Sequence, residues 1–167
     1  MLRQTSIYGF LGGHAEAMII SGIHTTCQFN TKIFYSDGKT PNLWSSDPLN
    51  NPDFDDDKLS FYADDCAITL NEDATAYTIK SATNEASIVN LTVIRTAPGF
   101  HVGKDGKSYF GTNPNKPWGS MRHAFWPRCR VEGNIITKAG VLDFKGRGFF
   151  THALQGMKPH HAGNSVA

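Results

Sequence analysis

The sequence has few cysteines and no long apolar run. Its three cysteines, Cys27, Cys66 and Cys129, are widely spaced and form no Cys-x-x-Cys pair. An odd number at this spacing predicts reduced, buried thiols rather than a disulfide framework. The apolar stretch Ala17–Ile20 is far shorter than the ~20 residues of a membrane-spanning helix. The N-terminus also lacks the apolar core of a signal peptide, so we expect a cytoplasmic protein.

A large net charge is absent too, but the charges are unevenly distributed. The formal net charge is +1. Residues 1–100 hold 6 Lys and Arg against 12 Asp and Glu, whereas residues 101–167 hold 10 against 3. Two interpretations stay open: strands of opposite charge pair in one sheet, or the C-terminal part forms a basic surface for acidic headgroups or an acidic partner. Because no dense basic run or RNA-binding signature is present, we expect no nucleic-acid partner.

Helix patterns are scarce, and only His14–Ile20 could form a short helical turn. Apolar residues instead alternate with polar ones, as in Cys27–Tyr35 and Ser87–Arg95. In the second segment Ile88 and Ile94 lie opposite the main apolar set, so both faces could be covered. Prolines and glycines fall mostly between the apolar runs, where turns are expected. The chain therefore reads as a succession of short strands.

Two hairpins are predicted from paired runs. Cys66–Leu70 and Ala76–Lys80 flank the polar loop Asn71–Thr75. A second hairpin covers Val131–Phe144, with its turn near Lys138–Gly140, and a last strand follows at residues 147–154. We predict an all-β fold, an antiparallel β-barrel or sandwich of one domain. Residues 1–21 show no clear strand pairing, so the barrel could be incomplete.

No catalytic or metal-binding motif is well formed. Ser120 lies outside a G-x-S-x-G elbow, so a nucleophilic role is not predicted. A zinc site could draw on several side chains without short ligand spacing: His152, His160 and His161, with His123 or Cys129. The pair Asp64 and Asp65 could act as acid and base, but solvated carboxylates at a strand end are far commoner. The acidic loop Asn50–Lys58 lacks the glycine and the terminal glutamate of an EF-hand.

The unusual feature is an aromatic and basic cluster in Pro117–Arg130, followed by His152–Ala162. Six residues of the cluster are candidates for binding: Trp118, Met121, Arg122, His123, Phe125 and Trp126. In one interpretation they form a plug that closes a barrel end, with Arg122 stacked on Trp. In the other they form the rim of an apolar cavity around a lipid chain, where Arg122, His123 or Arg128 bonds its polar head. Both interpretations stay open.

Several segments carry a resemblance to a known family. They are long and unusual in composition, and they span Gly22 to Ala162, about five sixths of the chain: Gly22–Phe29, Phe61–Asp65, Tyr77–Ser81, Pro117–Pro127 and His152–His161. In these segments the chain resembles the fungal oxidative-stress survival factors, the Svf-like proteins. The resemblance implies a pair of lipocalin-like β-barrels in one cytosolic protein. Residues 22–162 would form the first barrel, after a poorly defined segment 1–21 and before a tail, residues 163–167.

The resemblance also implies a function. Family members support survival under oxidative stress and sphingolipid homeostasis, and they carry ceramide between endoplasmic reticulum and Golgi without vesicles. They attach peripherally to these membranes through an amphipathic N-terminal helix, and the nucleus is a further compartment. The partner implied is a long-chain lipid such as ceramide, with no cofactor. Residues 1–17 show no amphipathic stripe with a basic face, and a second barrel is missing here.

The leading hypothesis is therefore a non-enzymatic lipid-binding module of a stress-survival protein. An alternative is a lipocalin-like hydratase or isomerase acting on apolar substrates, in which Asp64, Asp65 and His123 would be acid and base groups. A third is a truncated product without independent activity. An enclosed apolar cavity would favour lipid binding, and carboxylates converging on a pocket would favour the enzyme.

Overall fold

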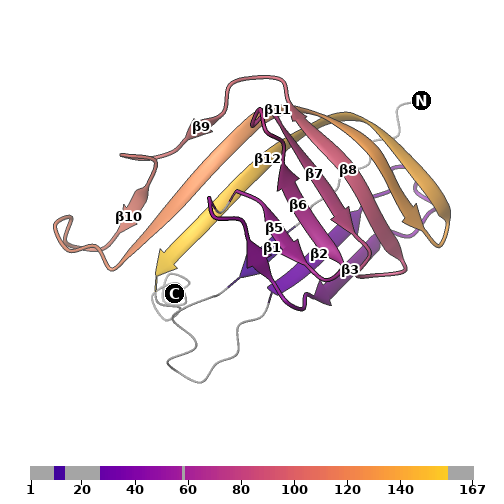
Figure 1. The fold of residues 1–167 in the computed structure, drawn as a ribbon, viewed down its shortest axis with the longest axis horizontal. Helices are drawn as coiled ribbons and strands as arrows, with labels where there is room; N and C mark the ends of the chain where they lie inside the picture. The colour runs from indigo at the N-terminus through magenta and orange to yellow at the C-terminus, as the bar shows by residue number, and fades with distance from the viewer. Residues whose placement is uncertain (1–9, 14–26, 58, 158–167) are drawn as a thin grey trace. The chain divides into compact units, whose positions relative to one another are not determined.

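The structure is a computed structural model that describes residues 10–13, 27–57 and 59–157. These residues form twelve strands and their connections: β1 (Phe10–Gly13), β2 (Cys27–Ile33), β3 (Leu43–Pro48), β4 (Asp53–Phe54), β5 (Phe61–Ala63), β6 (Cys66–Leu70), β7 (Ala76–Ser81), β8 (Ser87–Arg95), β9 (Phe100–His101), β10 (Ser108–Phe110), β11 (Gly119–Thr137) and β12 (Gly140–Met157) (Figure 1). The part of the chain so described contains no helix, which confirms the all-β prediction. Consequently none of these residues belongs to a helix that could cross a membrane.

The strands form two antiparallel sheets. One has three strands in the order β1-β2-β3. The other has nine strands, with β10-β11-β8-β7-β6-β5-β4 along its path and both β9 and β12 paired with β11. A barrel requires the first and last strands of a sheet to pair. Among the described strands neither sheet closes in this way. The described part of the chain therefore forms open antiparallel sheets rather than a closed barrel.

The chain divides into two compact units. The first, which we call the sandwich unit, comprises Met1–Val93 and Val131–Lys145. The second, which we call the ribbon unit, comprises Ile94–Arg130 and Gly146–Ala167. The long strands β11 and β12 each contribute residues to both units. We describe each unit by itself.

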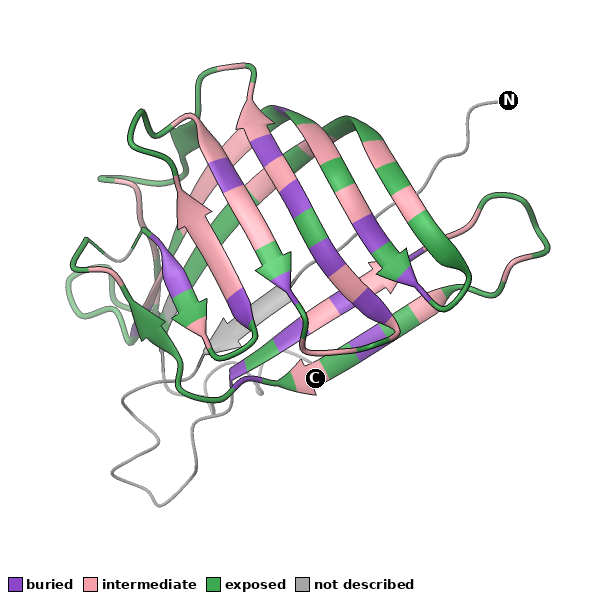
Figure 2. Ribbon diagram, turned by 45° about the vertical axis from the view of Figure 1, so that its right-hand side comes forward, coloured by how far each residue is buried: buried purple, intermediate pink, exposed green. Residues whose placement is uncertain are grey.

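Strand periodicity builds the core of the sandwich unit. Along β2, Cys27, Phe29 and Ile33 are buried while Gln28 is exposed, as the alternation predicts. They pack in one cluster with buried residues of the larger sheet: Phe61, Cys66, Val89, Leu91 and Ile135, together with Leu49 from the connection after β3. Figure 2 shows this alternation of buried and exposed residues along the strands. These side chains pack between the two sheets of the sandwich unit.

The cysteines behave as predicted. All three are free and buried. Burial raises the pKa of the Cys66 thiol to about 11, and the neighbouring Cys27 adds to the shift. Burial also raises the pKa values of Cys27 and Cys129. A thiol that stays protonated at neutral pH is a poor nucleophile and metal ligand, so these residues act as small apolar side chains.

The hairpin predictions are confirmed in one case and corrected in another. Strands β6 and β7 pair across the loop at 71–75, whose ends are joined by the Asn71 side chain accepting bonds from the Thr75 and Ala76 amides. The turn near Lys138 is also present. Its strands, however, are 19 and 18 residues long, so residues 147–154 belong to β12 rather than to a separate strand. The aromatic cluster extends β11 because aromatic side chains favour extended backbone.

Part of the N-terminal segment forms a strand that the pattern did not predict. Phe10–Gly13 pairs antiparallel with β2, and Gly12 lies opposite Gln28. Two adjacent glycines disfavour a strand by propensity, so tertiary pairing decides the structure at this position. The predicted helical turn at His14–Ile20 lies outside the described residues.

The buried hydroxyl of Thr31 gives a stability prediction. Thr31 is 1% exposed, and its Oγ1 has no hydrogen-bond partner among the described residues. An unpaired buried hydroxyl costs about 1–3 kcal/mol, and valine has a similar shape without it. We expect Thr31→Val to raise the free energy of unfolding by about 1 kcal/mol in chemical denaturation.

A buried hydroxyl pair provides the control of opposite sign. Ser45 and Ser87 are hydrogen bonded at 2.8 Å between the two sheets. Because Ser87→Ala leaves the Ser45 hydroxyl unpaired, it should lower the free energy of unfolding by about 1–2 kcal/mol. If Thr31→Val lowered the free energy of unfolding as much as Ser87→Ala does, the unpaired Thr31 hydroxyl would not be destabilising.

Candidate functional site

The aromatic cluster lies on the part of β11 that belongs to the ribbon unit. Strands β10 and β9 pair with it in register: Ser120 lies opposite Tyr109, and Phe125 lies opposite Phe100. Successive side chains of a strand point to opposite faces. The six predicted residues are therefore distributed over two faces of the strand and the residue before it, rather than gathered in one plug or rim.

One face carries three neighbouring rings. The rings of Phe100 and Phe125 are stacked 5.2 Å apart at 23°, and the His123 ring lies 5.6 Å from Phe125, tilted by 44°. The His123 carbonyl also accepts a 3.1 Å bond from the Val102 amide. By alternation, Met121 falls on this same face and is half-buried. The His123 side chain is thus part of this group of rings.

The opposite face carries Trp126. Its ring lies 5.6 Å from Phe150 of β12, and the Arg95 guanidinium lies 5.3 Å from the ring centre. Arg122 falls on this face by alternation and is exposed. His152 is exposed as a residue, yet partial desolvation lowers the pKa of its imidazole, and the positive charge of Arg122 lowers it further. The lowered pKa favours neutral His152, and both Arg95 and Arg122 bring positive charge to this face.

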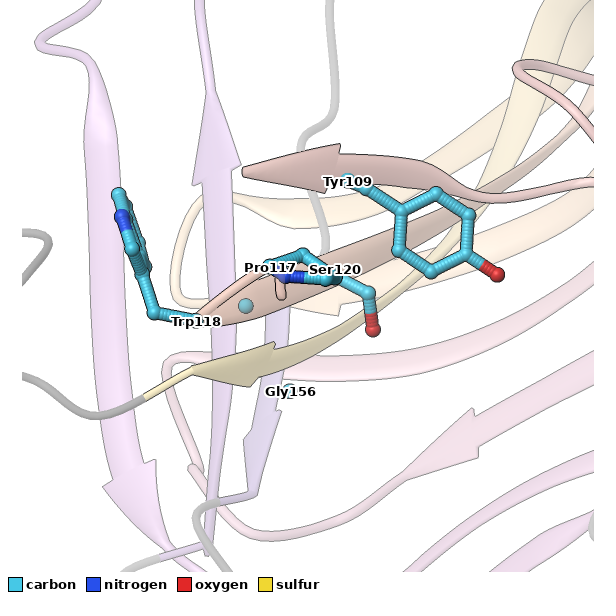
Figure 3. Close-up of a pocket in the computed structure, with 6 residues that line it drawn as sticks. Tyr109, Pro117, Trp118, Ser120 and Gly156 are labelled. Carbon is cyan, nitrogen blue, oxygen red and sulfur yellow. The ribbon is translucent and has the colours of Figure 1, made fainter. Parts of the chain in front are cut away.

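A small open cavity lies where β11 begins. Its volume is about 200 Å³ and its lining is Tyr109, Pro117, Trp118, Gly119, Ser120 and Gly156. In Figure 3 the Trp118 indole and the Tyr109 ring stand on opposite sides of Pro117 and Ser120. The Trp118 ring stacks on Phe110 at 6.0 Å, and its amide donates a 2.9 Å bond to the Phe110 carbonyl. The cavity thus combines aromatic walls with two neutral hydroxyl groups.

Large apolar side chains are exposed throughout the ribbon unit. Their exposed fractions run from 40% for Trp118 to 67% for Phe149, and the others are Phe100, Val102, Tyr109 and Leu154. Clustered exposed apolar residues mark a binding surface, whereas single ones are ordinary. The sandwich unit exposes six large apolar side chains as well, so exposure alone does not single out the ribbon unit; the ribbon unit combines them with the aromatic cluster of β11.

The alternative catalytic candidates occupy ordinary structural positions. Asp64 and Asp65 form the exposed turn between β5 and β6, and both carboxylate oxygens of Asp64 accept bonds of 3.0 Å from Asn51. Within 10–13, 27–57 and 59–157, no group of three His, Cys, Asp or Glu side chains could hold a metal ion. His160 and His161 lie outside these ranges. The Cys129 thiol donates to the Trp126 carbonyl at 3.6 Å.

Neighbouring strands contribute residues that the sequence pattern did not indicate. Tyr109 and Gly156 line the cavity, and Phe100 and Phe150 stack on predicted residues. None stands in the cluster at Pro117–Arg130. Phe150 and His152, two residues apart beyond the second turn, gave a signal, but strand register was needed to use it.

Several known proteins are similar to this chain. A ceramide-binding protein of Aspergillus fumigatus is 68% identical over 143 residues, covering 86% of this chain and 36% of its own length. The ceramide-binding protein of Neurospora crassa is 62% identical, and the match covers 38% of its length. That of Schizosaccharomyces pombe is 45% identical, and the match covers 37% of its length. The chain therefore spans less than two fifths of the length of these relatives. No solved structure matches it significantly.

The family profile gives the broadest agreement. The profile of the Svf1 family matches residues 17–165, which include the two aromatic and histidine-rich segments that carried the resemblance. The match covers most of the chain. This chain belongs to the Svf1 family.

Proposed function

We propose that this chain is a non-enzymatic binding module for ceramide or a similar long-chain lipid. The main support is the similarity, over 86% of the chain, to proteins that are named for binding ceramide. The matched region contains the aromatic segment of β11. The exposed apolar side chains of the ribbon unit support the proposal, because a lipid with two alkyl chains requires such a surface.

The cavity suits one end of such a lipid. Its volume of about 200 Å³ is below the roughly 300–1,000 Å³ of sites that enclose a drug-sized ligand. Ceramide carries an amide and hydroxyl groups without net charge. The hydroxyls of Ser120 and Tyr109 can donate to and accept from such groups beside the apolar wall of Trp118. We place the polar end of the lipid in this cavity.

The alkyl chains would then follow the exposed apolar residues of the ribbon unit. Leu154 is 61% exposed and, by alternation along β12, shares a face with Gly156 and Phe150. Contact with alkyl chains would remove this surface from water, with a gain of about 25 cal/mol per Å². Trp118, Arg122 and Trp126 keep their predicted role as ligand contacts on this route, while Met121, His123 and Phe125 lie on the other face.

Binding without catalysis fits the chemistry of these side chains. Asp64 and Asp65 are exposed in a turn, and His123 packs against Phe125. Acid–base catalysis requires such groups to reach one substrate in a pocket. The relatives' names also describe binding rather than a reaction.

The cellular part of the proposal follows the family resemblance. We propose that the module works in the cytoplasm and at the surfaces of the Golgi and endoplasmic reticulum. There it would carry ceramide, maintain sphingolipid balance and support survival under oxidative stress. The partner for this work is the remainder of the longer family protein, since the relatives extend well beyond the matched region.

Filling the cavity tests the proposed position of the polar end. A Cβ added at Gly156 would lie 3.7 Å from the Ser120 Oγ, an ordinary contact, and the two further methyl groups of Gly156→Val add bulk at the cavity wall. We expect it to weaken binding of a fluorescent ceramide at least about tenfold, because even one extra methylene in a pocket costs about 1–3 kcal/mol. The measurement is a fluorescence titration of the purified chain.

The matched control is Gly146→Val on the same strand. A Cβ there meets no heavy atom within 4 Å, and Gly146 does not line the cavity. Its affinity for the fluorescent ceramide should equal that of the unaltered chain. Equal affinity of all three proteins would show that the lipid does not use this cavity.

A further inference from the structure

The two units carry opposite charge. Of the 16 Lys and Arg, nine fall in the ribbon unit, whereas only one of the 15 acidic residues, Asp105, does so. With His neutral, the ribbon unit has a formal charge of +8 and the sandwich unit −7. The asymmetry therefore follows the structural division. A unit with so few carboxylates cannot neutralise its cations internally, and it attracts anionic partners.

Part of this charge is concentrated in a hairpin turn. Lys104 and Lys107 pair across the turn between β9 and β10, and the Lys107 amide donates a 2.9 Å bond to the Lys104 carbonyl. The two central residues, Asp105 and Gly106, have φ values of 55° and 72°, as a tight hairpin turn requires. Like charges directly across a strand pair are destabilising. An external anion between the two ammonium groups would relieve that repulsion.

A third lysine lies close by. Lys116 is exposed in the connection between β10 and β11, where its amide closes a turn on the Asn113 carbonyl at 3.0 Å. Strand β10 has only three residues, so it separates the two connections by about 10 Å. Figure 1 shows the two connections at the two ends of the short strand β10. Charges within a Debye length of about 8–10 Å act together on a partner.

Exposed aromatic rings border these lysines. Tyr109 is 53% exposed and lies between the two connections, and Trp118, two residues after Lys116, is 40% exposed. Tyrosine and tryptophan combine an apolar body with a polar end, and they are enriched at the boundary between lipid headgroups and acyl chains. Lysines bordering such rings reach anionic headgroups with their ammonium groups. We call Lys104, Lys107, Tyr109, Lys116 and Trp118 the basic aromatic tip.

We propose that the basic aromatic tip docks on the surface of an anionic lipid bilayer. The lysines contact the headgroups, and the rings of Tyr109 and Trp118 enter the interface. An acidic protein would satisfy the lysines but has no need of two exposed rings beside them. The surface is separate from the N-terminal helix to which the family resemblance assigns membrane attachment. It also does not depend on ceramide being the ligand.

The test measures partition of the full 167-residue chain onto vesicles without ceramide. Vesicles of phosphatidylcholine with 30 mol% phosphatidylserine, a proportion of about one anionic lipid in three, should bind the chain in flotation assays, and pure phosphatidylcholine should bind it weakly. Each lysine near an anionic surface contributes roughly fivefold in partition. We therefore expect the triple variant Lys104→Gln, Lys107→Gln, Lys116→Gln to bind roughly 100-fold more weakly at low salt.

The matched control removes three positive charges from the sandwich unit instead. Lys39, Lys80 and Lys138 are exposed and belong to the sandwich unit, so their replacement by glutamine alters the net charge equally. That variant should bind within about threefold of the unaltered chain. Equal losses in the two triple variants, no binding to either vesicle, or binding to polyglutamate but not to vesicles would each overturn the proposal.

Discussion

Replacing Gly133 with alanine should lower the free energy of unfolding by about 4 kcal/mol. Gly133 has φ +127°, a conformation that side chains rarely adopt. An added Cβ would lie 2.2 Å from the Asn90 carbonyl oxygen and 3.0 Å from the Leu91 Cα. Both neighbours are backbone atoms of β8, so relief requires β8 and β11 to separate. Thermal unfolding followed by circular dichroism should show a midpoint lower by about 10 °C.

Gly140 provides the control for this variant. It has a similar φ of +118°, but an added Cβ would meet no heavy atom within 4 Å. Gly140→Ala thus reports the backbone strain alone, about 1–2 kcal/mol. The difference between the two variants measures the steric contact with β8. Similar midpoints for Gly133→Ala and Gly140→Ala would contradict the close approach of the two strands.

Truncation of Ile135 to alanine should cost about 3–4 kcal/mol. Its side chain is 0% exposed and belongs to the core cluster between the two sheets of the sandwich unit. Removal of three carbons loses their transfer free energy and leaves a cavity among neighbours such as Val89 and Leu91. Denaturant unfolding should show a lower midpoint with an unchanged slope.

The neighbouring residue gives a chemically identical control. Ile136 is 43% exposed because adjacent side chains of β11 point to opposite faces. Ile136→Ala should therefore cost less than about 1 kcal/mol. If the two truncations were equally costly, the register of β11 against the core would be wrong.

Period-two patterns predicted the core but not the length of the strands. The buried positions of β2 and β8, including Phe29, Val89 and Leu91, follow directly from alternation, because one-sided burial imposes a period of two. The sequence also indicated the turn near Lys138. It did not indicate that β11 continues through Pro127, or that Phe10–Gly13 pairs with β2. Those outcomes depend on pairing between distant segments, which local propensity does not report.

The binding role of the candidate residues stays a prediction. An excess of Trp, Arg and His in Pro117–Arg130 suggested a binding region, but it did not indicate how these residues are arranged. The arrangement depends on strand register, which placed Trp126 and His123 on opposite faces. Register also brought Tyr109 and Gly156 to the cavity from two other strands. A one-residue shift would exchange the faces, so residue composition alone could not decide this point.

The most direct test of the account is whether the chain itself carries a long-chain lipid. The purified 167-residue protein would be incubated with mixed lipids that include ceramide, separated from free lipid by size exclusion, and extracted for mass spectrometry. The account predicts that ceramide co-elutes with the protein in a saturable amount approaching one molecule per chain, and that the Gly156→Val variant retains less. A folded protein that elutes free of ceramide and of every other long-chain lipid would contradict it.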